Sequence, residues 1–395
     1  MEFRLAIAEA LCATPGWDGA FTAEETAAML EAPPNPDMGD FAFPCFKLAR
    51  TMRKAPPLIA ADLAGRIVLP AGVARVEALS GYLNFTLDRA ALSRAVLERI
   101  AHEGDRYGGS DVGGGRCVCI DYSSVNIAKP LHIGHLPSTV IGNALYRIYN
   151  HLGYRSVGIN HLGDWGTQFG KMIYAYKTWG SREAVERGGV DELVRLYVRF
   201  HQEAENDEAM NDAARAWFRR IEEGDAEATN LFNWFKEITL SEVQQVFDLM
   251  DIRFDSYAGE SFYNDKMGRV VDELRQKGLL KLDQGAQIVD LSAYKMPPCI
   301  ILRSDGATLY ATRDIAAALY RKDTYDFAKC LYVVAYQQSL HFRQWFKVVE
   351  LMGYPWAKDL VHVAFGMVSG TDGAFSTRRG NMVKLRDVLQ AAIVK

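Results

Sequence analysis

The sequence contains no run of apolar residues long enough to cross a membrane. Residues 1–10 carry an early acid, Glu2, and lack a continuous apolar core, so they predict an amphipathic helix and not a signal peptide. Low-complexity tracts and internal repeats are also missing. With 395 residues and 49% hydrophobic content, the chain can bury a large core, and we expect a cytoplasmic protein of two or more domains.

Cysteines are few, and the chain has no net positive charge. The six cysteines lack zinc-ligand spacing, and Cys117 and Cys119 share one face of an expected strand, so we predict buried reduced thiols and no metal site. The net charge of −4 excludes a uniformly basic nucleic-acid-binding protein. A local stripe such as Arg50, Arg53 and Lys54 can still contact phosphates, because a sum over the chain conceals the distribution of charge.

Glycine marks one domain boundary. Residues 108–115 read Gly-Gly-Ser-Asp-Val-Gly-Gly-Gly, which is too rich in glycine for regular structure and predicts a linker. Because this stretch precedes an expected strand instead of following one, it is not a phosphate-binding loop. We expect residues 1–107 to form an N-terminal α/β domain, with helices near 2–12, 22–31, 44–68 and 90–102 and strands at 76–79 and 83–87.

Strand and helix patterns alternate from Arg116 onward, which predicts an α/β domain over residues 116–395. The fold we expect is a Rossmann-like, doubly wound parallel sheet, interrupted by a charged helical insertion at about 181–250. Its expected helices lie at 134–152, 312–322 and 339–352, and its expected strands at 116–122, 154–160, 298–303, 330–335 and 360–365.

Two histidines flank a glycine where the first strand of this domain gives way to a helix. His132 and His135 are three residues apart, with the apolar run 116–121 before them and the amphipathic run 135–152 after them. A helix N-terminus offers N–H donors and partial positive charge, and Gly134 leaves room for a nucleotide, so the pattern predicts an ATP site. Because the pattern is short, a metal-binding pair or a helix cap remains an alternative.

Several segments resemble class I aminoacyl-tRNA synthetases and, within them, the arginyl-tRNA synthetases. These segments are residues 121–142, 160–170, 309–314, 332–342, 360–369 and 375–381. The resemblance implies an arginine–tRNA ligase, which activates L-arginine with ATP to arginyl-adenylate and transfers the arginine to the 3'-terminal adenosine of tRNA-Arg. It also implies ATP with Mg²⁺ as a substrate, no tightly bound cofactor, no membrane partner and a monomer.

A binding site for arginine follows from this resemblance. A guanidinium needs a carboxylate that accepts two parallel hydrogen bonds, and Asp314 stands four residues after Tyr310 on an expected helix, on the same face. Asp121, at the end of the first strand, is a candidate second carboxylate. Either acid could instead cap a helix or pair with a nearby cation. By resemblance to the family, Asn126 and Gln338 would hold the α-amino and carboxylate groups of arginine. The residues that match arginine contacts of the family are Ser124, Asn126, His135, Tyr310, Asp314 and Gln338.

A loop with two lysines completes the nucleotide site of class I synthetases. The resembling residues 375–381 read Phe-Ser-Thr-Arg-Arg-Gly-Asn and contain neither lysine. Thr377 stands in place of the second lysine, and Lys129, three residues before His132, is placed to supply the missing charge. A solvated surface loop is the alternative for the two arginines. We expect catalysis from His132, His135 and Lys129, and ATP contacts from His132, Gly134, His135, Ser376, Thr377, Arg378 and Arg379.

The N-terminal region resembles the additional domain that arginyl enzymes place against the tRNA elbow, on residues 35–44 and 81–85. Tyr82 and Asn84 alternate along one expected strand and share a face, so one could stack on a D-loop base while the other hydrogen-bonds its edge. Packing of Tyr82 in the core is an equal alternative.

Three residues depart from the pattern of the family: Val125 replaces proline, Pro137 replaces arginine, and Tyr336 replaces a small residue. We also expect that the C-terminal anticodon-binding domain of the family is absent, because the sequence stops at Lys395, and that tRNA binding is therefore weak. Two alternative functions stay open: a noncatalytic RNA-binding paralogue, and a small-molecule adenylyl-forming ligase on the same fold.

Overall fold

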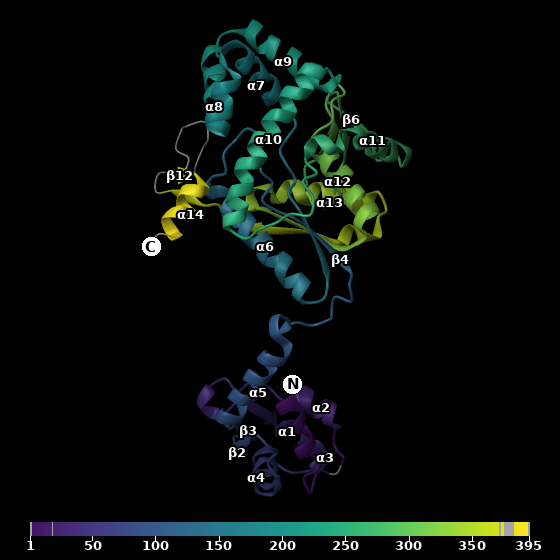
Figure 1. Cartoon of the computed structure of the whole chain (residues 1–395). Helices are drawn as coiled ribbons and strands as arrows, with labels where there is room; N and C mark the ends of the chain where they lie inside the picture. Colours follow the sequence, from purple (N-terminus) through teal and green to yellow (C-terminus); the bar gives the residue numbers. More distant parts are fainter. Residues whose placement is uncertain (1, 18, 371–372, 375–382, 394–395) are drawn as a thin grey trace. The chain divides into compact units, whose positions relative to one another are not determined.

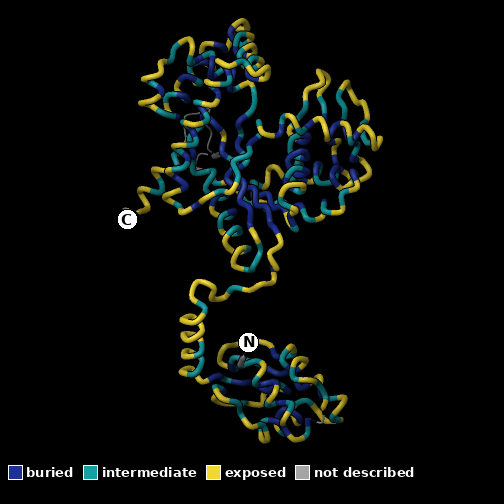
Figure 2. The backbone as a smooth tube through the Cα atoms, turned by 45° about the vertical axis from the view of Figure 1, so that its right-hand side comes forward, coloured by how far each residue is buried: buried dark blue, intermediate teal, exposed yellow. Residues whose placement is uncertain are grey.

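The computed structural model describes residues 2–17, 19–370, 373–374 and 383–393, and the chain divides into two compact units, Met1–Gly108 and Gly109–Lys395 (Figure 1). Each unit has its own buried core (Figure 2). Among the helices of these described residues, none is both long enough and apolar enough to cross a membrane.

A three-stranded antiparallel sheet forms the centre of the N-terminal unit. In the order β1-β3-β2, its strands are Phe41–Pro44, Tyr82–Leu87 and Val73–Leu79. Trp17 and Phe43 pack together in the core beside this sheet, with ring centroids 5.5 Å apart. The longer helices of the unit are α1 (Glu2–Cys12), α2 (Ala23–Met29), α4 (Pro56–Arg66) and α5 (Arg89–Glu103).

The single helix expected at 44–68 is wrong. Residues Phe41–Pro44 form strand β1, a 3-10 turn and the short helix α3 (Ala49–Met52) follow, and α4 begins only at Pro56. Proline lacks an N–H and disfavours helical backbone in the residue before it, but it fits the first turn of a helix. The pair of prolines at 56 and 57 therefore divides the segment into separate helices.

A four-stranded parallel sheet forms the centre of the second unit, which confirms the Rossmann-like fold. Helix α6 (Leu136–His151) connects β4 to β5, and α13 (Ser339–Leu351) connects β9 to β10. All residues of β4 are buried, as expected for a strand covered on both faces (Figure 2). The order is β10-β9-β4-β5, with bounds Leu360–Phe365, Phe327–Ala335, Cys117–Asp121 and Arg155–Ile159.

The strand expected at 298–303 exists but lies in a different sheet. It is β8 (Cys299–Leu302), the edge of a three-stranded antiparallel sheet with β6 (Leu280–Asp283) and β7 (Ala286–Val289). Gln284 and Gly285 join β6 to β7, and both have positive φ, 47° and 82°, as a tight hairpin requires. The expectation that this strand joins the parallel sheet is therefore wrong, because a hairpin precedes it instead of a crossover helix.

Helices make up the insertion, as expected for residues 181–250. They are α8 (Arg182–Glu203), α9 (Glu208–Glu222) and α10 (Ala226–Leu249), and Asp207 and Asp225 cap α9 and α10 through their side chains. An additional helix, α7 (Thr167–Trp179), packs against α9. At Gly170 of α7 a Cβ atom would lie only 2.1 Å from the carbonyl oxygen of Ala214 in α9, so the two helix backbones touch.

We predict that Gly142→Ala destabilises the fold. Gly142 is buried on α6, and a Cβ there would lie 2.2–2.5 Å from side-chain atoms of Tyr122. The substitution should lower the free energy of unfolding by about 1–3 kcal/mol, the usual cost of overpacking, in a urea titration. Gly268→Ala on α11 (Met267–Gln276) is the control, since nothing lies within 4 Å of its Cβ position. Equal stability of the two variants would contradict the prediction.

Candidate functional site

The candidate nucleotide site is built on residues 122–135, which connect β4 to α6 and are called the signature loop below. The loop leaves the carboxyl end of β4, where the chain order of the sheet reverses direction, the usual place for ligands in such sheets. Ser123, Ser124 and Ala128 have φ values of 69°, 49° and 59°, although none is glycine. Residues with a side chain adopt this left-handed backbone at an energetic cost, and they cluster at functional sites.

Side chains from outside the loop hold this backbone in place. Each accepts a hydrogen bond from a loop N–H group that would otherwise be buried without a partner. The acceptors belong to α6, to the segment after β5 and to α10 of the insertion, so the loop depends on tertiary structure. The three bonds run from Ser123 N–H to Ser138 Oγ (2.9 Å), from Val125 N–H to Asn160 Oδ1 (3.2 Å) and from Ala128 N–H to Thr239 Oγ1 (3.0 Å).

Two of the unusual residues fit their positions. The N–H of Val125 donates to Asn160, a bond that proline could not make, and the Val125 side chain is buried in the core. Pro137 lies in the first turn of α6, where a missing N–H costs nothing. Tyr336 is 57% exposed on the turn after β9, and nothing in the structure explains its size.

The two histidines form a compact unit at the start of α6. Gly134 N–H donates to His132 Nδ1 (3.1 Å), His132 N–H donates to His135 Nδ1 (3.2 Å), and the ring centroids are 4.0 Å apart. A Cβ on residue 134 would lie 2.8 Å from the His132 ring, so this position requires glycine. The histidines thus cap the turn, and their Nε2 atoms take no part in these bonds.

Both imidazoles favour the neutral form. Burial lowers the pKa of His135 to about 4, with His132 and Lys129 adding to the shift. Burial also lowers the pKa of His132, and the charge of Lys129 again contributes. At neutral pH the pair therefore supplies hydrogen-bonding groups, and Lys129 supplies the positive charge in its vicinity.

The segment that follows residues 375–382 adjoins the signature loop. Ile133 N–H donates to the carbonyl of Val383 (3.0 Å), and Leu385 N–H, at the start of α14 (Leu385–Ile393), donates to the carbonyl of Leu131 (3.0 Å). Residues 383–385 are thereby held beside the histidines. Outside the described residues lie four candidate ATP contacts: Ser376, Thr377, Arg378 and Arg379.

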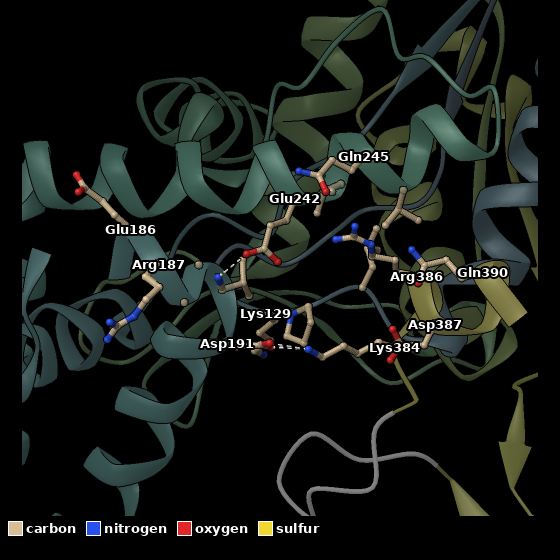
Figure 3. A pocket seen from close by; sticks show the side chains of 17 residues that line it. Lys129, Glu186, Arg187, Asp191, Glu242, Gln245, Lys384, Arg386, Asp387 and Gln390 are labelled. Atoms are coloured by element: carbon tan, nitrogen blue, oxygen red, sulfur yellow. Dashed lines mark hydrogen bonds and ion pairs between the residues drawn. The ribbon is translucent and has the colours of Figure 1, made fainter. Parts of the chain in front are cut away.

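Lys129 lines a cavity of about 520 Å³ between the signature loop, the insertion and α14 (Figure 3). Lys384 Nζ forms an ion pair with Asp191 Oδ2 of α8 at 2.6 Å across this cavity. Acidic and basic residues both line its wall, and neither Asp314 nor Tyr310 is among the described residues that do so. The cavity is therefore adjacent to the nucleotide candidates and separate from the arginine candidates.

The arginine candidates lie on α12 (Tyr310–Tyr325) and around it. Tyr310 begins α12 and is 68% exposed, and Asp314 follows one turn later. Asp314 Oδ2 lies 2.6 Å from His341 Nε2 on α13, which brings α12 and the turn that contains Gln338 together. Asn126 and Gln338 are both exposed, so their polar groups are accessible to a ligand.

Asp121 is paired inside the protein. Arg321 of α12 donates to Asp121 Oδ2 at 2.8 Å, with Arg321 1% and Asp121 8% exposed, and Ser124 donates to Asp121 Oδ1 at 2.9 Å. Both carboxylate oxygens are therefore engaged, which corresponds to the structural alternative for this acid. His161 stands beside the pair, 3.4 Å from the Arg321 guanidinium, and stacks on Tyr263.

Two further acids lie near Asp314. Asp164 is fully buried and paired with Lys236 at 2.6 Å, and its oxygens also accept the N–H and hydroxyl of Ser261. Glu260 lies 3.4 Å from Arg313. Burial raises the pKa of Glu260 to about 7, and the carboxylates of Asp164 and Asp314 add to the shift while Arg313 opposes it.

Sequence patterns did not single out Arg321, His341 or His161. Arg321 is seven residues after Asp314 on α12, a spacing that returns to the same helical face and could have indicated it. His341 lies 27 residues after Asp314, on α13, so no local signal in the sequence marks the pair. Because the sequence did not reveal that Arg321 pairs with Asp121, this acid was expected to contact the substrate.

The two tRNA candidates differ in exposure. Asn84 on β3 is only 5% exposed, and Tyr82 is half-buried with its ring 5.3 Å from that of Phe46. The burial of Asn84 leaves its amide little surface for a base edge. Contact of these residues with RNA stays a prediction.

We predict that Arg321→Met strongly destabilises the protein. It would leave the carboxylate of Asp121 buried without a cation, a change that costs about 3–5 kcal/mol. Arg147→Met breaks the exposed pair with Asp251 and should cost at most about 1 kcal/mol. Urea unfolding of both variants measures the difference, and similar losses would refute the buried-pair interpretation. The double change Arg321→Met with Asp121→Asn should regain part of the loss.

Family models match nearly the whole chain. The model described as "tRNA synthetases class I (R), catalytic domain" covers residues 97–395, and the "Arginyl tRNA synthetase N terminal domain" covers residues 1–87. Among solved structures, the arginyl-tRNA synthetase of Thermus thermophilus superposes with a TM-score of 0.70 over 98% of this chain and 69% of that chain, at 24% identity. That likeness supports the fold.

Curated relatives are closer in sequence. An arginine–tRNA ligase of Clostridioides difficile is 57% identical over 372 residues, which is 94% of this chain and 66% of the relative. One from Alkaliphilus metalliredigens is 54% identical over 93% of this chain and 65% of the relative. The chain thus spans slightly less than two thirds of the length of these proteins. It belongs to the arginyl-tRNA synthetase family of class I tRNA synthetases.

Proposed function

We propose that this chain activates L-arginine with ATP to arginyl-adenylate and transfers the arginine to the 3'-terminal adenosine of tRNA-Arg. The observation that carries this proposal is the charge balance around α12. Of four neighbouring acids, three pair with an arginine or a lysine: Asp121 with Arg321, Asp164 with Lys236 and Glu260 with Arg313. Asp314 instead faces His341, and histidine is not a permanent cation.

A substrate guanidinium would complete this balance at Asp314. The side chain of Asp314 is 28% exposed, so a ligand can reach its carboxylate, and a guanidinium can donate two parallel hydrogen bonds to it. Lysine offers no such fork, and citrulline would leave the acid without a countercharge. Sites that leave a buried polar group unpaired reject analogues by roughly 10⁴-fold.

The nucleotide would bind at the signature loop, as its magnesium complex. The carboxylate of arginine attacks the α-phosphorus of ATP, and pyrophosphate leaves, so the protein has to position the reactants and stabilise charge. His132 and His135, both neutral, would donate hydrogen bonds to phosphate oxygens, and Lys129 would supply a positive charge. The resemblance assigns further ATP contacts to Ser376, Thr377, Arg378 and Arg379, which lie outside the described residues.

The N-terminal unit would contact the elbow of tRNA. The match of residues 1–87 to the N-terminal domain model of arginyl-tRNA synthetases supports this role. The names of the relatives, arginine–tRNA ligases, support the reaction over a noncatalytic paralogue and over a small-molecule adenylyl-forming ligase. These alternatives still make different predictions in an exchange assay.

Arginine-dependent exchange of pyrophosphate into ATP, measured with and without tRNA-Arg, tests the proposal. We expect exchange that requires both arginine and tRNA. Exchange without RNA would support the small-molecule ligase, and no exchange at high enzyme and tRNA concentrations would support the noncatalytic paralogue. Replacing arginine by lysine or citrulline is the control for substrate identity.

Asp314→Asn should reduce arginine-dependent exchange by roughly 10³- to 10⁴-fold, because the guanidinium loses its counterion. ATP binding, measured by titration calorimetry, should be unaffected. Asp323→Asn on the same helix is the matched control, since Asp323 is 55% exposed and pairs with Arg269 at the surface. Normal exchange by Asp314→Asn would refute the assignment of the guanidinium to this residue.

A further inference from the structure

One hydroxyl joins the helical insertion to the signature loop. Thr239 lies on α10 and is fully buried. Its Oγ1 donates to the carbonyl of Phe235 on the preceding turn (2.8 Å) and accepts the N–H of Ala128 (3.0 Å). The bond to Phe235 fixes the hydroxyl proton, so a lone pair of the oxygen faces Ala128.

Ala128, whose N–H donates this bond, is a strained residue next to Lys129. Its φ of 59° is unfavourable for a residue with a Cβ, and it is 6% exposed. If Thr239 had no hydroxyl, the N–H of Ala128 would be buried without an acceptor. A return of Ala128 to negative φ would then relieve the strain, and it would turn the peptide that leads into Lys129.

The same face of α10 also contacts helix α8 at its kink. Glu242, three residues after Thr239, accepts the N–H of Val190 at 2.7 Å, next to Gly189, where α8 is kinked with a φ of 55° (Figure 3). Lys129 and Glu242 both line the cavity described above. The α10 helix is thus the element against which the signature loop and the kink of α8 are both placed.

We propose that Thr239 is a positioning residue of the nucleotide site: its hydroxyl fixes the backbone of Ala128 and thereby places the charge of Lys129 beside His132 and His135. The inference rests on the proposed function, in which Lys129 faces the phosphates of ATP. Thr239 itself contacts no substrate. Its role is to connect the insertion with the charge at the reacting phosphate.

The test uses three substitutions on α10 in the full chain. Thr239→Val keeps the shape and removes the hydroxyl, whereas Thr239→Ser keeps the hydroxyl. Thr229→Val is the matched control, because the Thr229 hydroxyl is buried on the same helix and makes no hydrogen bond with the described residues. We expect Thr239→Val to lower kcat of tRNA-dependent exchange between about tenfold and hundredfold, the effect of a small misplacement, while KM for arginine changes less than about twofold.

Thr239→Ser and Thr229→Val should both exchange at the wild-type rate. In a Lys129→Met background, Thr239→Val should have little further effect, since the residue acts through Lys129. An unchanged kcat in Thr239→Val, or an equal loss in both backgrounds, would overturn the proposal. An increase in KM for arginine with an unchanged kcat would also overturn it.

Amide hydrogen exchange separates this inference from the proposed function. Thr239→Val should raise exchange in a peptide covering residues 125–131, and neither Thr239→Ser nor Thr229→Val should do so. If the wild-type chain shows no pyrophosphate exchange, the proposed function fails, and the hydrogen-exchange comparison still decides whether Thr239 holds the loop. A rise spread over the whole chain would indicate general destabilisation and would contradict a positioning role.

Discussion

The buried, left-handed backbone after β4 is the constraint on which the site depends. Ser123, Ser124 and Ala128 adopt positive φ without being glycine, and neighbouring N–H groups are shielded from water. Their acceptors come from α6, from the segment after β5 and from α10. The loop therefore has its shape only when the sheet, the crossover helix and the insertion are assembled around it, which makes the insertion part of the site's architecture.

Charge pairing organises the other half of the site. Burying a carboxylate is costly unless a cation and hydrogen-bond donors accompany it. Asp121, with Arg321 and Ser124, and Asp164, with Lys236 and Ser261, meet both conditions within the chain. A third pair, Glu260 with Arg313, is looser, and its carboxyl has a pKa raised to about 7. From Asp121 and Asp164 to Glu260, the pairing of the carboxylate with a cation within the chain becomes weaker. Asp314 on α12 has an accessible carboxylate and pairs only with His341.

Sequence patterns predicted the strands with the longest apolar runs. The runs at β4 and β9 and the helices after them emerged correctly, because strands inside a sheet that is covered on both faces read as largely apolar. The strand β8 was placed in the wrong sheet, since an apolar run does not reveal its neighbour. At the site, the pair His132 and His135 and the four-residue spacing of Tyr310 and Asp314 could be recognised from the local sequence. The partners of Asp121 and Ala128 were not, because they lie 200 and 111 residues away along the chain.

The mutual dependence of Asp121 and Arg321 has an evolutionary consequence. Each residue is tolerable in the interior only because the other is there, so a mutation in either codon alone produces a less stable descendant. Lineages that replace the pair must therefore cross a fitness valley or acquire both changes at nearly the same time. Among descendants of this gene, residues 121 and 321 should therefore change together or not at all, whereas the two residues of a surface ion pair should change independently.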